Sequence, residues 1–222
     1  MTMPFTRDDL ARAEVKLQRN GRLFNARVTK VTLDGVVWTV KDFSDRPFYV
    51  RWVARFLLAR ELKALQRLKG IDGFAEDAFR LDADCMAVRY IDGRILLDIP
   101  DEEVTPEFLT QLENLTRCMH EAGIVHLDIR SKSNVLMRPD GTPAIIDFQA
   151  GLCTDAMPRR LKKLLEDIDL SGAYKKWREY HPESMGEYRK SELERINAIR
   201  RFWVLKGYFG LKKQKPTKTD GS

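Results

Sequence analysis

The chain has 222 residues, 43% of them hydrophobic, and carries a formal net charge of +6. This length suits one domain with a sizeable core, and no run reaches the ~18 apolar residues that a membrane-spanning helix requires. The three cysteines are spread along the sequence without metal-ligand spacing, which favours free thiols in a reducing compartment over a disulfide framework.

The N-terminal residues predict a helix that packs outside the first sheet. Thr6 and Asp9 have the spacing of a capping pair, apolar residues then recur every three or four positions, and Gly21 would end the helix. The stretch is charged and has no apolar segment of the kind found in secretory leaders, so we expect a cytoplasmic location.

A hairpin and a long helix follow. Residues 22–33 and 36–43 are strand-like and are joined by Asp34-Gly35, a pair typical of tight hairpins. Residues 47–68 have helical periodicity and begin with a proline, which suits a first helical turn. The apolar stripe expected to face the core comprises Val53, Phe56, Leu57, Leu65 and Leu68, with Phe48 and Trp52 also assigned to the core.

The middle of the chain changes from strands to helices. Residues 74–81 and 85–91 are two further strand-like runs separated by a short acidic turn. Residues 105–122 then predict a helix, with Thr105 as its N-cap and Pro106 in its first turn.

The most informative stretch is a predicted hairpin in the second half of the chain. Residues 135–137 and 144–146 are short apolar runs joined by a Pro-Asp-Gly turn. Because a hairpin brings its outer ends together, the polar side chains of Asp128, Asn134 and Asp147 should converge at one end.

These side chains suit phosphoryl transfer. Asp128 would orient the attacking hydroxyl, and Asn134 and Asp147 would supply oxygen ligands, which Mg²⁺ prefers, usually alongside substrate phosphates. Arg130 would offset the negative charge on the transferring group.

The stretch resembles the catalytic and metal loops of the protein-kinase-like fold. His126 and Asp128 resemble the ends of the H-R-D motif, Asn134 the catalytic-loop asparagine, and Asp147 the start of D-F-G. Among relatives the chain looks most like the bacterial lipopolysaccharide-core kinases of the Kdo and heptose type, with the RIO-type atypical kinases as near neighbours. The resemblance implies a two-lobed α+β fold, with a small sheet and a helix in the N-lobe and a mainly helical C-lobe.

The same resemblance assigns a nucleotide site that binds ATP with Mg²⁺, or with Mn²⁺ in its place. Lys41 would contact the α- and β-phosphates, Glu61 would pair with Lys41, and backbone groups of Arg89, Tyr90 and Ile91 would bind the adenine edge. The sequence has no Gly-rich loop before Lys41, so amides that cradle the phosphates must be supplied differently.

Two departures from protein kinases shape the functional hypothesis. Asn134 lies six residues after Asp128 where protein kinases have five, so Ser133 occupies the usual register. After Gly151 only residues 152–158 precede the next predicted helix, and the segment that protein kinases use to bind peptides is missing. The resemblance therefore implies a small-molecule or glycolipid hydroxyl as the acceptor.

The C-terminal stretch carries the positive charge. Residues 195–222 hold eight Lys and Arg against one Asp. Residues 191–210 have helical periodicity with aromatic residues beside cations, a pattern that suits peripheral contact with an anionic membrane, RNA binding, or docking of the apolar half on the large lobe. Upstream, either Asp167 or Asp169 is expected to brace the catalytic loop.

We therefore divide the chain into an N-lobe of residues 1–91, a C-lobe of residues 92–210, and a disordered basic tail of residues 211–222. The leading hypothesis is an ATP- and Mg-dependent kinase that acts on a glycan, a lipopolysaccharide core or another small molecule, in the cytoplasm or on the inner face of the membrane. The alternatives are a RIO-like atypical Ser/Thr protein kinase or ATPase, and a non-catalytic pseudokinase scaffold.

Overall fold

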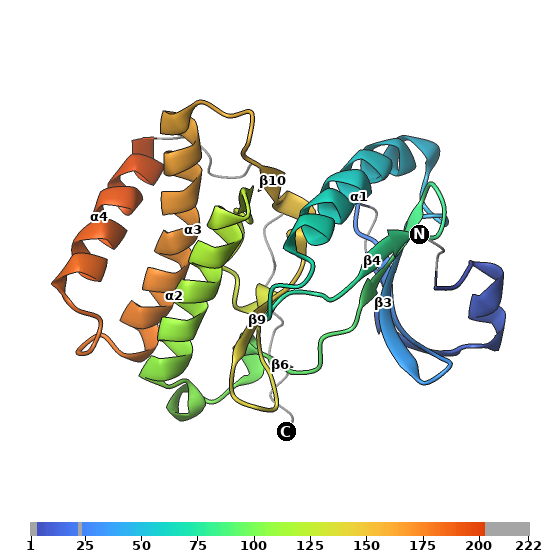
Figure 1. Cartoon of the computed structure of the whole chain (residues 1–222), viewed down its shortest axis with the longest axis horizontal. Helices are drawn as coiled ribbons and strands as arrows, with labels where there is room; N and C mark the ends of the chain where they lie inside the picture. Colours follow the sequence, from blue (N-terminus) through green and yellow to red (C-terminus); the bar gives the residue numbers. More distant parts are fainter. Residues whose placement is uncertain (1–3, 22–23, 203–222) are drawn as a thin grey trace, which may run out of the picture.

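The computed structural model describes residues 4–21 and 24–202, which form an α+β fold of two lobes (Figure 1). The N-lobe is a five-stranded antiparallel sheet in the order β1-β2-β3-β5-β4, with the long helix α1 packed against it. The C-lobe is mainly helical and carries two small sheets. This arrangement confirms the fold class expected from the sequence.

The N-lobe sheet is built around a regular hairpin. Its strands are β1 (Glu14–Arg19), β2 (Arg27–Leu33), β3 (Val36–Asp42), β4 (Ala78–Arg80) and β5 (Cys85–Arg89). The two hairpin strands, β2 and β3, pair without a break in register. Their turn needs positive φ at two successive residues, and Asp34 (φ 51°) and Gly35 (φ 76°) supply it. The predicted hairpin is therefore confirmed.

The predicted N-terminal helix is wrong. The Thr6 amide does donate to the Asp9 carboxylate at 2.8 Å, but the turn that follows is only a 3₁₀ helix, η1 (Asp8–Arg12). The chain then enters β1, which pairs with the outer edge of β2 from Glu14 opposite Thr32. All six residues of β1 are exposed. Backbone pairing with an open sheet edge has prevailed here over the helical spacing of a few apolar side chains.

Helix α1 (Phe48–Leu68) begins directly after Pro47, as predicted. The face buried against the rest of the protein consists of Val50, Ala54, Leu58, Glu61, Ala64, Leu65 and Leu68. Phe48 and Trp52, which we assigned to the core, are 83% and 76% exposed, and Phe56 is 62% exposed. The assignment failed because this helix is apolar on two opposite faces, and periodicity alone does not tell which face is buried.

Three long helices lie side by side in the C-lobe (Figure 1). They are α2 (Pro106–Glu121), α3 (Arg159–Tyr180) and α4 (Glu187–Phe202). The small sheets are β6 (Arg94–Ile95) with β8 (Val135–Met137) and β9 (Pro143–Ile145), and β7 (Ile124–Val125) with β10 (Leu152–Cys153). The remaining turns are the 3₁₀ helices η2 (Leu96–Asp98), η3 (Asp101–Glu103), η4 (Lys132–Asn134) and η5 (Phe148–Ala150). The hairpin β8–β9 is the one predicted from the sequence.

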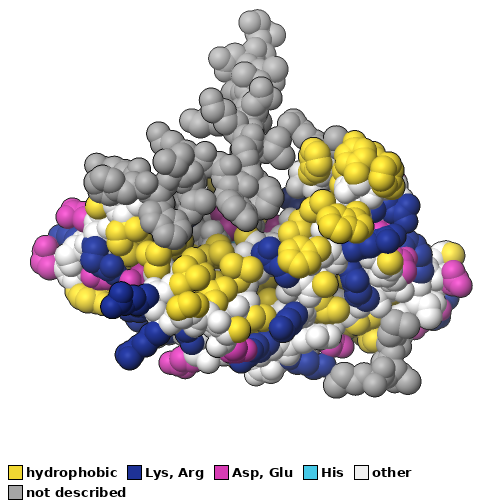
Figure 2. Space-filling view, turned by 90° about the horizontal axis from the view of Figure 1, so that it is seen from above, with side chains coloured by type: hydrophobic (Ala, Val, Ile, Leu, Met, Phe, Trp, Pro, Cys, Tyr) yellow, Lys and Arg dark blue, Asp and Glu magenta, His cyan; other side chains and the backbone are white. Residues whose placement is uncertain are grey.

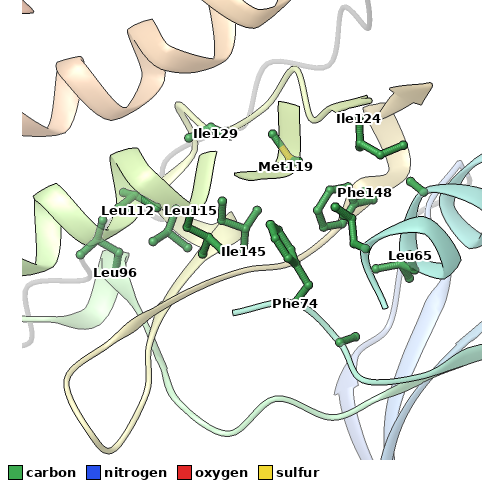
Figure 3. Close-up of a cluster of buried hydrophobic side chains, with 14 of the residues drawn as sticks. Leu65, Phe74, Leu96, Leu112, Leu115, Met119, Ile124, Ile129, Ile145 and Phe148 are labelled. Atoms are coloured by element: carbon green, nitrogen blue, oxygen red, sulfur yellow. The ribbon is translucent and has the colours of Figure 1, made fainter. Parts of the chain in front are cut away.

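One apolar cluster joins the two lobes (Figure 3). Phe148, which follows the β8–β9 hairpin, is fully buried. Its ring meets Phe74 at a centroid distance of 5.8 Å and His126 at 4.7 Å, and Leu65 brings α1 into the same cluster. A second, smaller cluster around Trp38 covers the opposite face of the N-lobe sheet. The shared cluster fixes α1 and the loops after the hairpin relative to each other.

Helix α4 packs on the C-lobe through Leu193 and Ile196, each 1% exposed, so its apolar part docks as one of our alternatives predicted. The membrane and RNA predictions for the C-terminal stretch rest mostly on residues 203–222, which lie outside the described residues. The division of the chain at residues 91 and 211 stays a prediction. Among the described residues, no helix combines the length and apolarity needed to span a bilayer.

Candidate active site

Lys41 joins three elements of the fold at one point. Its position on β3 turns the side chain toward α1, where Nζ meets Oε1 of Glu61 at 2.5 Å. The same Nζ donates to Oδ1 of Asp147 at 3.0 Å. Both Lys41 and Glu61 are buried. The predicted contact between them is therefore present, and the lysine also reaches the carboxylate that follows the β8–β9 hairpin.

The electrostatics favour the charged forms of Lys41 and Asp147. The ammonium of Lys41 lowers the pKa of Asp147 to about 2, with a smaller effect from Arg19 at the end of β1. Burial alone would lower the pKa of Lys41, but Asp147 and Glu61 raise it above its ordinary value. Burial raises the pKa of Glu61, against the attraction of Lys41. Asp147 is thus a carboxylate across the physiological range, and its charge is lost only as pH falls from about 4 toward 2.

The backbone at Asp147 adopts the left-handed region, with φ 68° and ψ 66°, which is uncommon for a residue with a Cβ atom. Two hydrogen bonds on the preceding residue hold it there. The amide of Ile146 donates to the carbonyl of Asn134 at 3.0 Å, and the carbonyl of Ile146 lies 3.0 Å from Nε2 of His126. The metal loop predicted from sequence is therefore tied directly to the catalytic loop.

The catalytic loop has one residue more between Asp128 and Asn134 than protein kinases have, and the turn η4 accommodates it. The amide Nδ2 of Asn134 donates to Oδ2 of Asp128 at 2.8 Å and to its carbonyl at 3.1 Å. Ser133, which occupies the usual register of the sequence motif, instead meets the hydroxyl of Ser131 at 2.7 Å. Asp128 is exposed, while Asn134 is buried. Asn134 is therefore the residue that stands beside Asp128, as predicted.

Asp169 on α3 braces the catalytic loop from below. Its carboxylate accepts the amides of His126 and Leu127, each at 2.7 Å, and it is 1% exposed. Leu127 has φ 65°, so these bonds hold a strained turn. The ring of His126 accepts the amide of Asp128 at Nδ1, at 3.2 Å, which leaves its proton on Nε2. Of the two carboxylates that the sequence left open, Asp169 is the brace.

Asp169→Asn is expected to lower the free energy of unfolding by about 1.5–3 kcal/mol, because a buried charged acceptor of two amides is lost. Urea unfolding measures this change. The matched control is Glu179→Gln on the same helix, a carboxylate that is 39% exposed and pairs with Lys132 at 3.2 Å, so it should cost no more than about 1 kcal/mol. Equal costs for the two variants would contradict the bracing role.

The comparisons with known proteins agree with this geometry. The RIO domain family matches residues 15–185, most of the chain. The chain belongs to the RIO domain family. No curated protein matches it. The lipopolysaccharide-core type, which the sequence analysis placed first, receives no support, and its predicted neighbour is the family found.

A solved structure shares the fold of this RIO domain. It is the Rio2 kinase–ADP/Mg²⁺–phosphoaspartate complex from Chaetomium thermophilum, with a TM-score of 0.57 and 15% sequence identity. The match covers 84% of this chain and 63% of that one, so this chain spans less than two thirds of that protein's length. At this level of identity the similarity shows the fold alone.

Arg130 does not lie where the sequence analysis placed it. Its guanidinium Nη1 donates to Oδ1 of Asn197 at 3.1 Å and lies 3.5 Å from Oγ of Ser171, so it faces α3 and α4. The backbone of the catalytic loop also approaches α3 closely. A Cβ on Gly172 would lie 2.9 Å from the amide nitrogen of Arg130. The prediction that Arg130 faces the transferring group is therefore wrong for this RIO domain.

Some of the backbone groups predicted to bind the adenine edge already make hydrogen bonds within the protein. The amide of Arg89 donates to the carbonyl of Asp77 at 2.7 Å, and the amide of Tyr90 donates to the carbonyl of Val37 at 3.1 Å. Both amides are thus used by the sheet. The roles of the remaining backbone groups, including those of Ile91, stay a prediction.

Sequence reasoning missed two residues that support the site. Arg46 holds the connection from β1 to β2, because its guanidinium donates to the carbonyls of Gly21 at 2.7 Å and Asn25 at 3.2 Å. Lys176 on α3 is 1% exposed and donates from Nζ to the carbonyl of Ile129 in the catalytic loop. Burial lowers the pKa of Lys176 to about 7. Neither residue belongs to a recognisable motif, so only the contacts reveal them.

The buried Lys176 should leave a signature in the pH dependence of stability. Its folded-state pKa of about 7 lies below the ordinary 10.5, so the unfolded chain binds more protons between these values. The free energy of unfolding therefore gains a contribution that rises with pH from about 7 to 10.5. Urea unfolding at pH 7 and pH 10 should show this rise in the wild type and in Lys16→Met on the exposed strand β1, but not in Lys176→Met. A rise of the same size in Lys176→Met would contradict the assignment.

Proposed function

We propose that this RIO domain binds ATP with Mg²⁺ and transfers its terminal phosphoryl group, as an atypical kinase or ATPase. The observation that carries the proposal is the meeting of Lys41, Glu61 and Asp147 beside the Asp128–Asn134 pair. A buried lysine held by two carboxylates on separate elements is a costly arrangement. We infer that the arrangement serves to bind phosphate beside a metal ligand.

The residues present fit a magnesium ion and a triphosphate. The Asp147 carboxylate is 28% exposed and ionised, so it is accessible as a ligand. Oδ1 of Asn134 is a second oxygen, which accepts from the Ser133 hydroxyl at 3.3 Å, and the Asn134 carbonyl bonds the amide of Ile146 next to Asp147. Within residues 4–21 and 24–202 no three His, Cys, Asp or Glu side chains gather as a metal site. The remaining ligands would therefore be phosphate oxygens and water, as is usual for Mg²⁺.

Each side chain then has a distinct role. Lys41 places a permanent positive charge against the phosphates, and Glu61 fixes the direction of its ammonium. Asp147 and Asn134 would hold Mg²⁺, which neutralises charge on the phosphates when it is bound. Asp128 orients the acceptor and takes its hydroxyl proton, while the Asn134 amide holds the carboxylate in place.

The acceptor is a small hydroxyl compound or water in this proposal. Between Gly151 and α3 the chain has only β10 and one tight turn, which leaves little surface for an extended peptide. A glycan or glycolipid acceptor, our leading hypothesis from sequence, remains compatible with this short link. The RIO family membership favours the atypical kinase or ATPase over it.

Two measurements on the purified chain test the function. We expect ATP to raise the thermal midpoint only when Mg²⁺ is present, and ADP to form from Mg-ATP, with phosphate released when no acceptor is added. Nucleotide binding without ADP formation under any acceptor condition would instead identify a pseudokinase. Absence of both stabilisation and turnover would contradict the whole assignment.

A further inference from the structure

The outward face of α1 carries aromatic side chains that point away from the core. Phe48, Trp52 and Phe56 recur every four residues and are 83%, 76% and 62% exposed, and Tyr49 beside them is 49% exposed. We call these four residues the aromatic stripe. With about 200 Å² for each side chain, the stripe exposes roughly 500 Å². A contiguous apolar patch of this size usually marks an interaction surface.

The charged side chains of α1 that lie beside the aromatic stripe are arginines. The only acid of α1 is Glu61, which is buried against Lys41. Arg51 and Arg55 line a shallow groove together with Phe48, Tyr49 and Trp52. Figure 2 shows the stripe as a yellow group with Lys and Arg side chains beside it.

The two arginines of the groove are held in place. Nε of Arg51 and Nε of Arg55 donate to the buried carboxylate of Asp84 at 2.9 and 2.7 Å. Two guanidiniums on one carboxylate leave a net positive charge at the surface. A ligand for this groove must therefore combine apolar parts with negative charge.

Two occupants from this chain itself are disfavoured by charge. A second copy would bring the same cations against those of the first. Residues 203–222 contain five Lys and one Asp and would be repelled in the same way. The arginines beside the stripe instead call for an anionic partner.

We propose that the aromatic stripe docks this protein on an anionic phospholipid bilayer. Residues 48–60 consist only of aromatic residues, aliphatic residues and arginines. Apart from the Tyr49 hydroxyl, the stripe and the two groove arginines present rings and guanidiniums. Rings of this kind partition to the boundary between headgroups and acyl chains, and guanidiniums pair with lipid phosphates. This inference does not depend on the proposed phosphoryl transfer.

Vesicle flotation tests the docking. The probes are vesicles of phosphatidylcholine alone and of phosphatidylcholine with 30 mol% phosphatidylglycerol, a composition of roughly physiological charge. We expect the wild type to bind the anionic vesicles, and the Trp52→Ser/Phe56→Ser double variant to bind at least ~10-fold more weakly. The matched control is Leu97→Ser/Tyr188→Ser, which removes two side chains of the C-lobe that are 62% and 67% exposed. The control should bind like the wild type.

A second variant distinguishes a loss of membrane binding from a folding defect. Trp52→Phe retains the apolar surface, so it should still bind anionic vesicles. In vesicles with brominated acyl chains, wild-type tryptophan fluorescence should be quenched more than that of Trp52→Phe. Several results would overturn the proposal: no binding by the wild type, equal binding by the double variant, or equal quenching with and without Trp52. Self-association that the double variant abolishes, without vesicle binding, would assign the stripe to a second copy instead.

Discussion

Asp128→Asn is expected to lower the rate of ADP formation from Mg-ATP by roughly 10²–10⁴-fold, the usual contribution of a positioned general base. ATP binding should change little, because Asp128 contacts Asn134 and not Lys41. The asparagine oxygen still accepts the hydrogen bond from Asn134, but it takes up no proton from an acceptor. A coupled ADP assay measures the rate, and calorimetric titration with a non-hydrolysable ATP analogue measures binding.

Ser133→Ala is the matched control for this prediction. Ser133 holds the position that the usual spacing gives to the asparagine. Its hydroxyl contacts that of Ser131 at 2.7 Å and donates to Oδ1 of Asn134 at 3.3 Å. Its removal should lower the rate by no more than about tenfold, since one neutral hydrogen bond to Asn134 is lost and no charged group. If Asp128→Asn kept wild-type turnover, or if Ser133→Ala were equally damaging, the roles assigned to the catalytic loop would be wrong.

Asp147→Asn should remove most of the Mg²⁺ dependence of ATP binding, weakening binding in the presence of Mg²⁺ by about tenfold or more, because the anionic metal ligand is lost. The fold should survive. Asparagine tolerates the left-handed backbone of this position as well as aspartate does, and Lys41 keeps its contact with Glu61. Titration with the ATP analogue, with and without Mg²⁺, measures the difference.

The pH dependence gives an independent check on Asp147. Because its pKa is held at about 2, Mg-dependent binding by the wild type should not decline through protonation of this group between pH 8 and pH 5. Asp140→Asn, in the exposed turn of the same hairpin, should bind like the wild type. An unchanged Mg²⁺ dependence in Asp147→Asn would place the metal ligand elsewhere.

The elements that sequence predicted well are those with strong local signals. Asp34-Gly35 fixes the turn of the first hairpin, and the second hairpin brings Asn134 and the residue before Asp147 together. In these hairpins a short stretch of chain determines the geometry, so a pattern of a few residues was enough. The contact between Lys41 and Glu61 was expected from the resemblance to kinases, and it is present.

The wrong predictions have a different cause. Each concerns which surface of a segment packs against a part of the chain that is distant in sequence. The open edge of β2 recruited β1 from the residues expected to form a helix. Phe48 and Trp52 were assigned to the buried face of α1, but both side chains are exposed. The catalytic loop packs closely on Gly172, and the Arg130 side chain bonds Asn197 on α4 instead of facing the site. Tertiary contacts decide these points, and no local pattern records them.

The short link between Gly151 and α3 has a consequence for control of the protein. Residues 152–158 contain a single hydroxyl side chain, that of Thr154, and it is 1% exposed. A modifying enzyme would find no accessible serine, threonine or tyrosine there on which to install a covalent on–off signal. We therefore expect phosphorylation within this link to play no part in switching the protein.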